Sequence, residues 1–333
     1  MGPARVVVRA PATSANMGPG FDTLGIAVGL YDEFAFTVLG SGPSRAVTYD
    51  EGSPATDGGR AAARPAVPTD GTNLAIRAFK AFYTDLGLRA PEVEVTCRSR
   101  IPVGRGLGSS AAAITAGITA AEAMLGCGGD VDADGDDATD AATGLQRRLD
   151  LAARIEGHPD NTSACILGGM VASAQVASSV LWARVPLGAR LNGVVAIPET
   201  VLSTKIARNV LPSNVPHSDA VFNVGRVALL VASMVSGDLR NLHWATEDRL
   251  HQPYRASLAP GMASAMRLAV EAGALGAYVS GAGPSVMALV AEGCQSGAVA
   301  EAMATAFAQS RVECTIMNLP MGAPGAGVLQ GQR

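Results

Sequence analysis

IPVGRGLGSSAAAITAGITAAEAML, residues 101–125, is the stretch that decides the fold, because it predicts a glycine-rich turn that leads without a break into a helix. Three glycines let the backbone take positive φ and approach a ligand closely: Gly104, Gly106 and Gly108. Ser109 and Ser110 can cap the helix, and the alanine-rich run after them has high helix propensity. Because a helix N-terminus presents unpaired N–H groups and a positive dipole end, the turn is predicted to hold phosphate.

Glycines before a helix are also ordinary loop punctuation, so the GxGxG pattern alone favours a plain loop. The stretch is not a Walker loop, because no GK[ST] closes it. A dinucleotide fingerprint is equally disfavoured, because the first strand-like run lies about a hundred residues upstream instead of directly before the turn.

Length and composition predict a folded, two-domain protein. The chain has 333 residues, of which 48% are apolar and 16% charged, enough for two cores. Its net charge of −4 argues against a nucleic-acid surface. Five cysteines without a CxxC pair indicate free thiols in a reducing cytoplasm. We expect no membrane contact, because no apolar run approaching about 20 residues and no signal peptide was identified.

The segment PATSANMGPGFDTLG, residues 11–25, places Pro, Asn and three Gly between two apolar runs. It predicts a loop with several special backbone positions, following a short strand over 5–10. Asn16 and Asp22 are polar groups that could face a cavity. The local alternative is that both side chains bond their own backbone in turns.

A carboxylate is expected beside the phosphate turn, because the helix predicted over 145–156 ends in Glu156 and leads into GHPDN. Mg²⁺ between nucleotide phosphates takes hard oxygen ligands, and few of them from protein. The alternative for Glu156 is a solvated helix end. Two arginines, Arg208 and Arg255, are candidates for a substrate carboxylate because a guanidinium matches it in a bidentate way; surface salt bridges are their alternative. Thr204 shares a helix face with Arg208.

The remaining segments carry structural expectations. The acidic stretch 126–144 fails the EF-hand pattern and predicts a flexible insertion, and 40–71 predicts a surface excursion between strands. A helix opening near Pro68 is expected to be capped by Asp70 or Thr72. The apolar helix over 219–236 is assigned mostly to core. Residues 272–290 predict strand, SGAGPS turn and strand, 312–320 a closing strand, and the tail after Gly322 disorder.

Several of these strings resemble the GHMP small-molecule kinases. PVGRGLGSSAA is similar to their phosphate loop, and the SGAGPS segment to their third motif, whose glycines let the backbone pack against that loop. ATSANMGPGFDTLG, EGHPDN, ARNVLP and HQPYR resemble motifs of the homoserine kinase family within the GHMP kinases. They stand in family order from residue 5 to about residue 320.

The resemblance implies a two-domain α+β GHMP kinase fold. Residues 1–170 would form the nucleotide-binding domain, like domain 2 of ribosomal protein S5, and residues 171–333 a ferredoxin-like substrate domain. It also implies transfer of phosphate from MgATP to L-homoserine in threonine biosynthesis, in the cytoplasm. The expected partners are this small substrate and, for the oligomeric state, a second copy of the chain; nucleic acid and membrane are not expected.

Residue roles also follow from the resemblance. The nucleotide would be held by Pro102, Val103, Gly104, Arg105, Gly106, Leu107, Gly108, Ser109, Ser110, Ala111 and Ala112. Glu156 and Ser110 would hold the metal. The amino acid would be held by Asn16, Asp22, His158, Asp160, Thr204, Arg208, Arg255 and Gly281. Catalytic roles would fall to Asn161, Arg208 and Ser109.

Two departures and two rival functions accompany these roles. Many GHMP kinases have an aspartate base where Asn161 stands, and an amide cannot take that proton, so we expect no strong base. Thr162 and Ser163 replace the usual Val-Ala, which leaves helix capping or an altered substrate preference open. The rivals are a kinase of the same fold for another acceptor, such as threonine, a sugar or an isoprenoid alcohol, and a non-catalytic binding protein.

Overall fold

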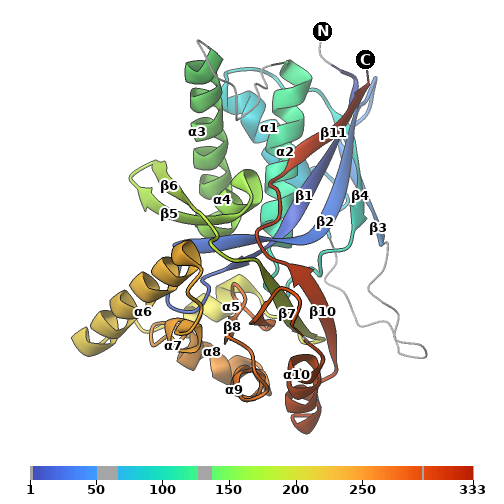
Figure 1. The fold of residues 1–333 in the computed structure, drawn as a ribbon. Coiled ribbons are helices and arrows are strands. Elements are labelled where there is room, and N and C mark those ends of the chain that lie inside the picture. The colour runs from blue at the N-terminus through green and yellow to red at the C-terminus, as the bar shows by residue number, and fades with distance from the viewer. Residues whose placement is uncertain (1–2, 51–66, 127–136, 295, 333) are drawn as a thin grey trace.

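Two β-sheets, each covered by helices, meet at the middle of the molecule in the computed structural model, which describes residues 3–50, 67–126, 137–294 and 296–332 (Figure 1). The larger sheet has seven strands in the order β11-β1-β2-β4-β3, with β5 on β2 and β6 on β5. Its strands are β1 Arg5–Ala15, β2 Leu24–Val38, β3 Arg45–Asp50, β4 Val93–Ser99, β5 Met170–Val176, β6 Ser179–Val185 and β11 Gly327–Gln332. All pairs are antiparallel except β3 with β4.

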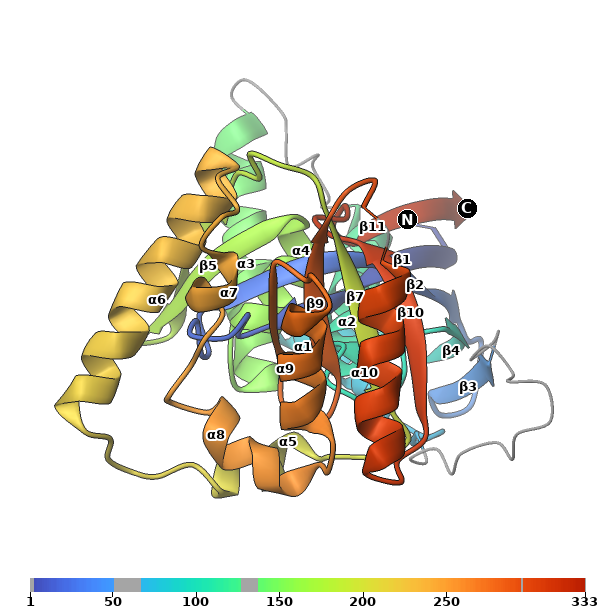
Figure 2. The same cartoon turned by 60° about the horizontal axis from the view of Figure 1, so that its bottom comes forward.

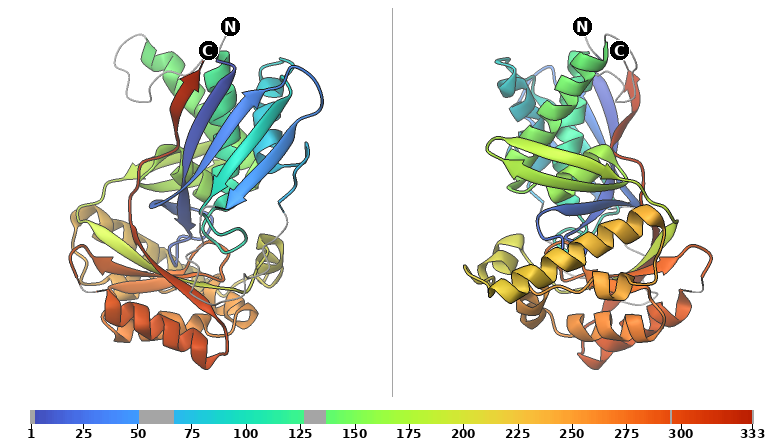
Figure 3. Two further views of the ribbon diagram at one scale, coloured as in Figure 1. Left: turned by 90° about the vertical axis from the view of Figure 1, so that its right-hand side faces the viewer. Right: turned by 60° about the vertical axis from the view of Figure 1, so that its left-hand side comes forward.

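Helices cover one face of this sheet, as the left view of Figure 3 shows. They are α1 Leu74–Asp85, α2 Ser109–Leu125, α3 Asp137–Glu156 and α4 Asp160–Leu167. Helix α2 lies between α1 and β1 and is nearly all buried, from Ala111 to Met124. Its N-terminus faces the second sheet, whereas its C-terminal end, at Gly126, is exposed.

The smaller sheet is antiparallel, in the order β10-β7-β9-β8. Its strands are β7 Leu191–Pro198, β8 Gly276–Val279, β9 Val286–Ala291 and β10 Cys314–Pro320. Figure 2 shows α9 and α10 side by side on its outer face. The helices of this half are α5 Thr204–Asn209, α6 His217–Ser236, α7 Leu242–Ala245, α8 Gln252–Arg255, α9 Met262–Glu271 and α10 Gly297–Gln309, with a 3₁₀ turn Ala256–Leu258.

Strand β7 joins the two halves through its alternating side chains. Val194 and Ala196 face the core beneath α9 and α10. Val195 and Ile197 belong to the large core that continues into the first sheet. Because successive residues of a strand point to opposite faces, one apolar strand serves both cores and holds the two halves together.

The C-terminal tail is ordered, so the expectation of disorder after Gly322 was wrong. Strand β11 pairs antiparallel with β1, from Arg5 opposite Gln332 to Arg9 opposite Gly327. Both chain ends therefore lie at the same end of the molecule (Figures 1 and 3). The tail has little apolar character of its own, and its strand forms because it completes the edge of β1.

Other element bounds also differ from expectation. Helix α3 starts at Asp137, so 137–144 is helical instead of flexible, whereas 127–136 lies outside the described residues. Strand β3 lies within 40–71, of which 51–66 is outside the described part. Helix α1 is capped by Asn73, whose side chain accepts from the Ala75 amide, and not by Asp70 or Thr72. The larger sheet also includes β5 and β6, which run from residue 170 to residue 185. A domain boundary at residue 170 stays a prediction.

Helix α6 is mostly exposed, which corrects its assignment to core. Only Asn223, Leu230, Ser233 and Met234 are buried along it. Val224 is 67% exposed and Val221 56%. The expectation that no run was long and apolar enough to span a membrane was also wrong, since α6 meets that criterion by length and composition, with 22% of its 18-residue window buried. Hydropathy reports an apolar helix but not what covers it.

Candidate active site

The glycine-rich turn takes the predicted backbone shape at the start of α2. Gly104, Gly106 and Gly108 have φ of +69°, +78° and +71°. Gly108 is itself the N-cap, and no side chain caps the helix, so the capping role expected for Ser109 and Ser110 was wrong. Both serines instead form the first turn, where their hydroxyls and amides face the opening between the two halves.

Two of the glycines are required by close neighbours. A Cβ at Gly106 would collide with the carbonyl oxygen of Ser280, and one at Gly108 with the hydroxyl of Thr13. The Ser280 hydroxyl also donates to the Gly106 carbonyl at 2.7 Å. The predicted packing of the SGAGPS turn against the phosphate loop is therefore confirmed.

A cleft with an empty volume of about 560 Å³ opens in front of this turn. It brings together most of the predicted site residues, namely Asn16, Asp22, Gly104, Gly106, Gly108, Ser109, Ser110, Glu156, His158, Asp160, Asn161, Thr204, Arg208, Arg255 and Gly281. Leu202, Ala282 and Gly283 also line it and were not anticipated. The amide of Leu202 bonds the Gly104 carbonyl at 3.3 Å, a link between distant segments that no local pattern reveals.

The other residues predicted to contact the nucleotide do not line the cleft. Leu107, Ala111 and Ala112 are fully buried in the large core. The Arg105 guanidinium faces the end of β7, where it donates to the carbonyls of Pro198 and Thr200. Pro102 and Val103 are partly exposed on the approach to the turn. Their side chains support the loop from behind, and its backbone is what faces the cleft.

The loop after β1 is held in an unusual backbone shape. Asn16, Met17 and Asp22 have φ of +67°, +44° and +54°. Non-glycine residues adopt such angles only when their surroundings impose them, often at functional sites. The Asn16 amide donates to the Gly281 carbonyl at 2.7 Å and accepts from the Asp22 backbone N–H at 3.0 Å. Asn16 thus makes the expected turn bond and also ties the loop to the second half.

The charged groups of the cleft form pairs. Arg208 donates two bonds to the Asp22 carboxylate, at 2.9 and 2.7 Å. Arg255, only 2% exposed, donates to the Gly281 carbonyl at 3.0 Å. Burial and the neighbouring Arg208 lower the pKa of Arg255 to about 10, so it remains charged at neutral pH. The salt bridge considered as the alternative is present at Arg208, whose pair with Asp22 is partly exposed in the cleft, whereas Arg255 is buried and not at the surface.

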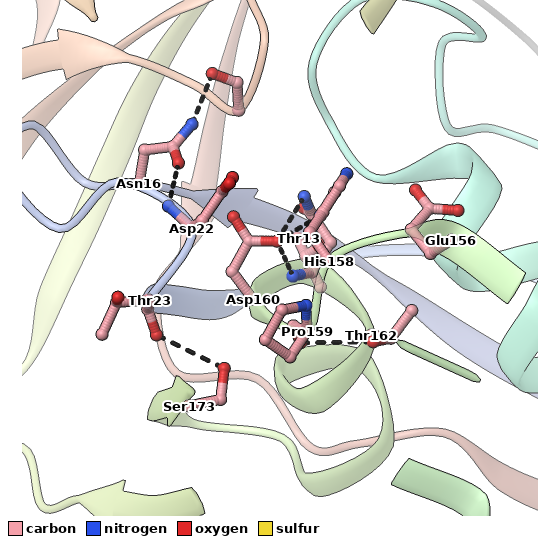
Figure 4. Close-up of polar contacts among 12 residues, drawn as sticks. Thr13, Asn16, Asp22, Thr23, Glu156, His158, Pro159, Asp160, Thr162 and Ser173 are labelled. Atoms are coloured by element: carbon pink, nitrogen blue, oxygen red, sulfur yellow. Dashed lines mark hydrogen bonds and ion pairs between the residues drawn. The ribbon is translucent and has the colours of Figure 1, made fainter. Parts of the chain in front are cut away.

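Asp160 and His158 lie close to Asp22, with one carboxylate oxygen or ring nitrogen from each residue within 4.8 Å of the others (Figure 4). Asp160 Oδ1 is 2.5 Å from His158 Nδ1 and accepts the Asn161 amide N–H at 2.7 Å. Burial lowers the pKa of His158, but the nearby carboxylates of Asp160, Glu156 and Asp22 outweigh it and the pKa is raised. The result is an acidic group of side chains suited to an ammonium ion.

Asn161 is oriented from the β1 side. The Thr13 hydroxyl donates to its Oδ1 at 2.7 Å, which leaves the Nδ2 side of the amide toward Asp160 and the cleft. Thr162 bonds back to the Pro159 carbonyl at 3.2 Å, and Ser163 Oγ is buried without a hydrogen-bond partner in the described part of the chain. Neither of these two residues lines the cleft, so an altered substrate preference gains no support from them.

Glu156 and Ser110 offer hard oxygen atoms beside the phosphate loop. The Ser110 hydroxyl lies 2.5 Å from Glu156 Oε1. Burial raises the pKa of the Glu156 carboxyl, and the Ser110 hydrogen bond only partly opposes this. A poorly solvated carboxylate next to a phosphate site fits a divalent cation, because the positive charge of the cation would stabilise the ionised carboxylate that burial disfavours.

Comparison with known proteins places this geometry in a family. A model of the GHMP kinases N-terminal domain matches residues 73–169, and one of the GHMP kinases C-terminal region matches residues 230–309. The homoserine kinase of Moorella thermoacetica is 42% identical over 97% of this chain and 99% of its own. That of Gloeobacter violaceus is 43% identical over 92% and 94%. The chain belongs to the homoserine kinase family.

Solved structures agree with this assignment to the homoserine kinases. The homoserine kinase of Cytophaga hutchinsonii superposes with a TM-score of 0.81 at 28% identity, over 98% of both chains. The mevalonate kinase of L. major shares the fold alone, with a TM-score of 0.61 at 14% identity. The predicted family and the two-domain GHMP kinase fold are therefore confirmed.

Thr13 and Ser14 lie behind the cleft of this homoserine kinase family member, and the sequence did not indicate a role for either. Thr13 bonds Asn161 through its hydroxyl and the Leu107 carbonyl through its amide, at 2.7 and 3.1 Å. The Ser14 hydroxyl lies 2.8 Å from that of Ser280. The two side-chain contacts join residues 148 and 266 apart, and nothing in the local sequence signals them.

His251 gives the fold a pH dependence. Its ring is fully buried, and this burial lowers its pKa from 6.5 to about 4. The carboxylates of Asp248 and Asp22 oppose the shift, and the positive charge of Arg255 adds to it. Between these values the unfolded chain binds more protons, so the free energy of unfolding should fall as pH falls from 6.5 toward 4. A urea titration series should show the wild type losing up to about 1.4 kcal/mol per pH unit more than His251→Gln. Parallel slopes would contradict this account.

Proposed function

We infer that this enzyme transfers the γ-phosphoryl group of ATP to the side-chain hydroxyl of L-homoserine, giving O-phospho-L-homoserine and ADP. The observation that carries this is the set of paired opposite charges facing the phosphate loop across one cleft, Asp22 with Arg208 and Asp160 with His158. A zwitterionic amino acid needs such a set, whereas a sugar or an isoprenoid alcohol offers no ammonium to match it. The identity to homoserine kinases supports the same acceptor.

The nucleotide would lie with its phosphates on the 104–110 turn. The amides at the start of α2 are free to donate into the cleft, and a 17-residue helix adds a positive end at that point. Glu156 and Ser110 would hold Mg²⁺ there. When bound, the ion neutralises charge on the phosphates and so favours phosphoryl transfer.

The bound amino acid would replace an ion pair that two residues lining the cleft form with each other. Asp22 and Arg208 are each about one third exposed and face each other in a bidentate pair. An α-ammonium can take the place of the guanidinium on Asp22, and an α-carboxylate the place of the aspartate on Arg208. Each charge exchanges one partner for another, which limits the cost of desolvation. Arg255 would add a second guanidinium to the carboxylate.

Asn161 supplies orientation without acting as a base. Its amide cannot accept the hydroxyl proton, and the Thr13 bond to Oδ1 leaves donor hydrogens on the cleft side. Phosphoryl transfer through a loose transition state depends chiefly on positioning and charge, so the absence of a base at this position is tolerable.

Replacing Asn161 with alanine tests this role. We expect kcat to fall by less than about 10⁴-fold, since even a true base contributes about 10²–10⁴-fold. The measurement is steady-state turnover with homoserine, alongside the homoserine dissociation constant by calorimetry. A larger loss with unchanged binding would show that Asn161 takes part in proton transfer. Asn161→Asp is the companion variant, and a kcat above that of the wild type would show that a base had been limiting.

Acceptor competition tests the function as a whole. ADP release should be fastest with homoserine, slower with threonine, and near the acceptor-free background with mevalonate. Preference for threonine would support a kinase for another hydroxy amino acid. Failure to release ADP with any acceptor, despite MgATP binding, would support the non-catalytic alternative.

We propose that the exposed face of α6 pairs with a second copy of the chain. Its outward residues are Val221, Val224, Gly225, Ala228, Leu229, Ala232 and Val235. No charge interrupts this stripe, so two copies related by a twofold axis can meet along it without like-charge repulsion. Small residues at 225, 228 and 232 allow close approach of two helices.

We also propose a cytoplasmic location. It is supported by the free thiols of Cys97, Cys165, Cys294 and Cys314.

Sedimentation of a Val224→Glu variant checks the pairing. The wild type should sediment at twice the chain mass of 33.7 kDa, and the variant as a monomer, because two glutamates would be buried together. Val224 makes little contact within its own chain, so the fold should survive. Leu88→Glu, at another exposed apolar position, is the control. A monomeric wild type, or one that floats with lipid vesicles, would overturn this proposal.

A further inference from the structure

His251 occupies a position between the 16–22 loop and the buried Arg255. Its Nε2 lies 2.7 Å from the Gly18 carbonyl oxygen, and its Nδ1 lies 3.2 Å from Arg255 NH1. The ring stacks on Phe21 with centroids 5.2 Å apart. Both ring nitrogens are thus used, one toward the loop and the other toward the guanidinium.

The two contacts select the same tautomer. A guanidinium only donates, so Nδ1 must accept from Arg255 NH1. A carbonyl only accepts, so Nε2 must carry the proton and donate to Gly18. One neutral imidazole satisfies both partners at once. Burial lowers the pKa of His251, which favours this neutral form throughout the physiological range.

The backbone around His251 is fixed independently. Asp248 Oδ2 accepts from the amides of His251 and Gln252 at 2.8 and 2.6 Å, at the start of α8. On the opposite side, a Cβ at Gly18 would collide with the Thr246 carbonyl, so the loop rests directly on this segment. The ring is therefore held at both ends, and its orientation cannot change without moving the loop or Arg255.

We propose that His251 is a positioning residue, which transmits the closed shape of the 16–22 loop to Arg255 and aims its guanidinium at the substrate carboxylate. This rests on the proposed function. Without the Nδ1 acceptor, the hydrogen bonds of Arg255 are to the carbonyls of Gly281 and Ala207, and its guanidinium still lies over the Phe21 ring, 5.2 Å from the centroid. The Gly281 carbonyl also accepts from Asn16, so Arg255 shares this oxygen with a second donor.

Two substitutions separate the functions of the two ring nitrogens. An asparagine places Oδ1 where Nδ1 stood and keeps the side-chain acceptor for Arg255. A glutamine reaches the Gly18 carbonyl with Nε2 but removes that acceptor and leaves Arg255 only its other contacts. His251→Gln should raise the KM for homoserine about tenfold, the usual effect of one hydrogen bond to a charged group, with the KM for ATP within about twofold. His251→Asn should raise the KM for homoserine less than about threefold. His217→Gln, at an exposed histidine of α6, is the control.

A double-mutant cycle with Arg255→Lys distinguishes positioning from simple support of the fold. If His251 acts through the guanidinium, His251→Gln should change the homoserine KM less than about twofold in the Arg255→Lys background. The same rise in both backgrounds, or equal rises for glutamine and asparagine, would overturn the proposal. Should His251→Gln fail to fold, a large KM rise in His251→Asn would overturn it by itself. A wild type that phosphorylates no homoserine would refute the proposed function first, and this inference with it.

Discussion

Glu156→Gln should lower kcat with MgATP and homoserine by about 10³-fold while leaving the fold intact. The change removes one charge and keeps the shape, so the Ser110 hydroxyl still finds an oxygen or nitrogen at its 2.5 Å position. What is lost is the anionic ligand for the metal at the phosphate loop. Losses of about 10²–10³-fold are typical when one fixed electrostatic partner of a transition state is removed.

The measurement is a titration of turnover with Mg²⁺ and Mn²⁺ in both proteins. The variant should need far more of either ion to reach half of its maximum rate. Glu301→Gln, on the outer helix α10, is the matched control and should behave as the wild type. An unchanged metal dependence in Glu156→Gln, whatever the rate, would place the ion on other residues.

Gly108→Ala should weaken nucleotide binding, raising the dissociation constant for a non-hydrolysable ATP analogue at least about 100-fold. A Cβ there would overlap the Thr13 hydroxyl, and Thr13 could move only by giving up its bond to Asn161. The φ of +71° adds about 1–2 kcal/mol of strain for any L side chain. Both effects act on the turn whose amides would meet the phosphates.

Gly126→Ala is the control for that experiment, because Gly126 has the same φ of +71° but no neighbour near its Cβ position. It ends the same helix that Gly108 begins. Both variants should be less stable in thermal unfolding because of this backbone strain. Only Gly108→Ala should also lose nucleotide affinity, as measured by calorimetry. Equal affinity in the two would show that the 104–110 turn is not the phosphate site.

The parts of this site that sequence could predict are those encoded in short, chemically specific strings. The glycine turn before α2 and the Asn16–Asp22 loop each need several special residues in a row, and both took the expected shape. Glu156 was recognisable because a carboxylate ends a helix beside that turn. In these cases the local chain already contains the reason for its conformation.

The failures share a different cause, because each depends on what lies opposite in space. Hydropathy marked α6 as apolar but could not say that one face is left uncovered. Nothing in GVLQGQ indicates a strand until the edge of β1 is available to it. Ser110 does not form the cap expected from its place at the helix start, because its hydroxyl meets Glu156, 46 residues away; only the family resemblance had placed these two residues together.

The return of the last strand to the first has a consequence for biosynthesis. Because β11 completes the sheet that β1 begins, the first half of the molecule remains unfinished until residues 327–332 have left the ribosome. An emerging chain would expose the open edge of β1 throughout translation. Truncating the tail should therefore damage the half of the enzyme that is made first, and nascent chains arrested before residue 327 should be the most prone to aggregate.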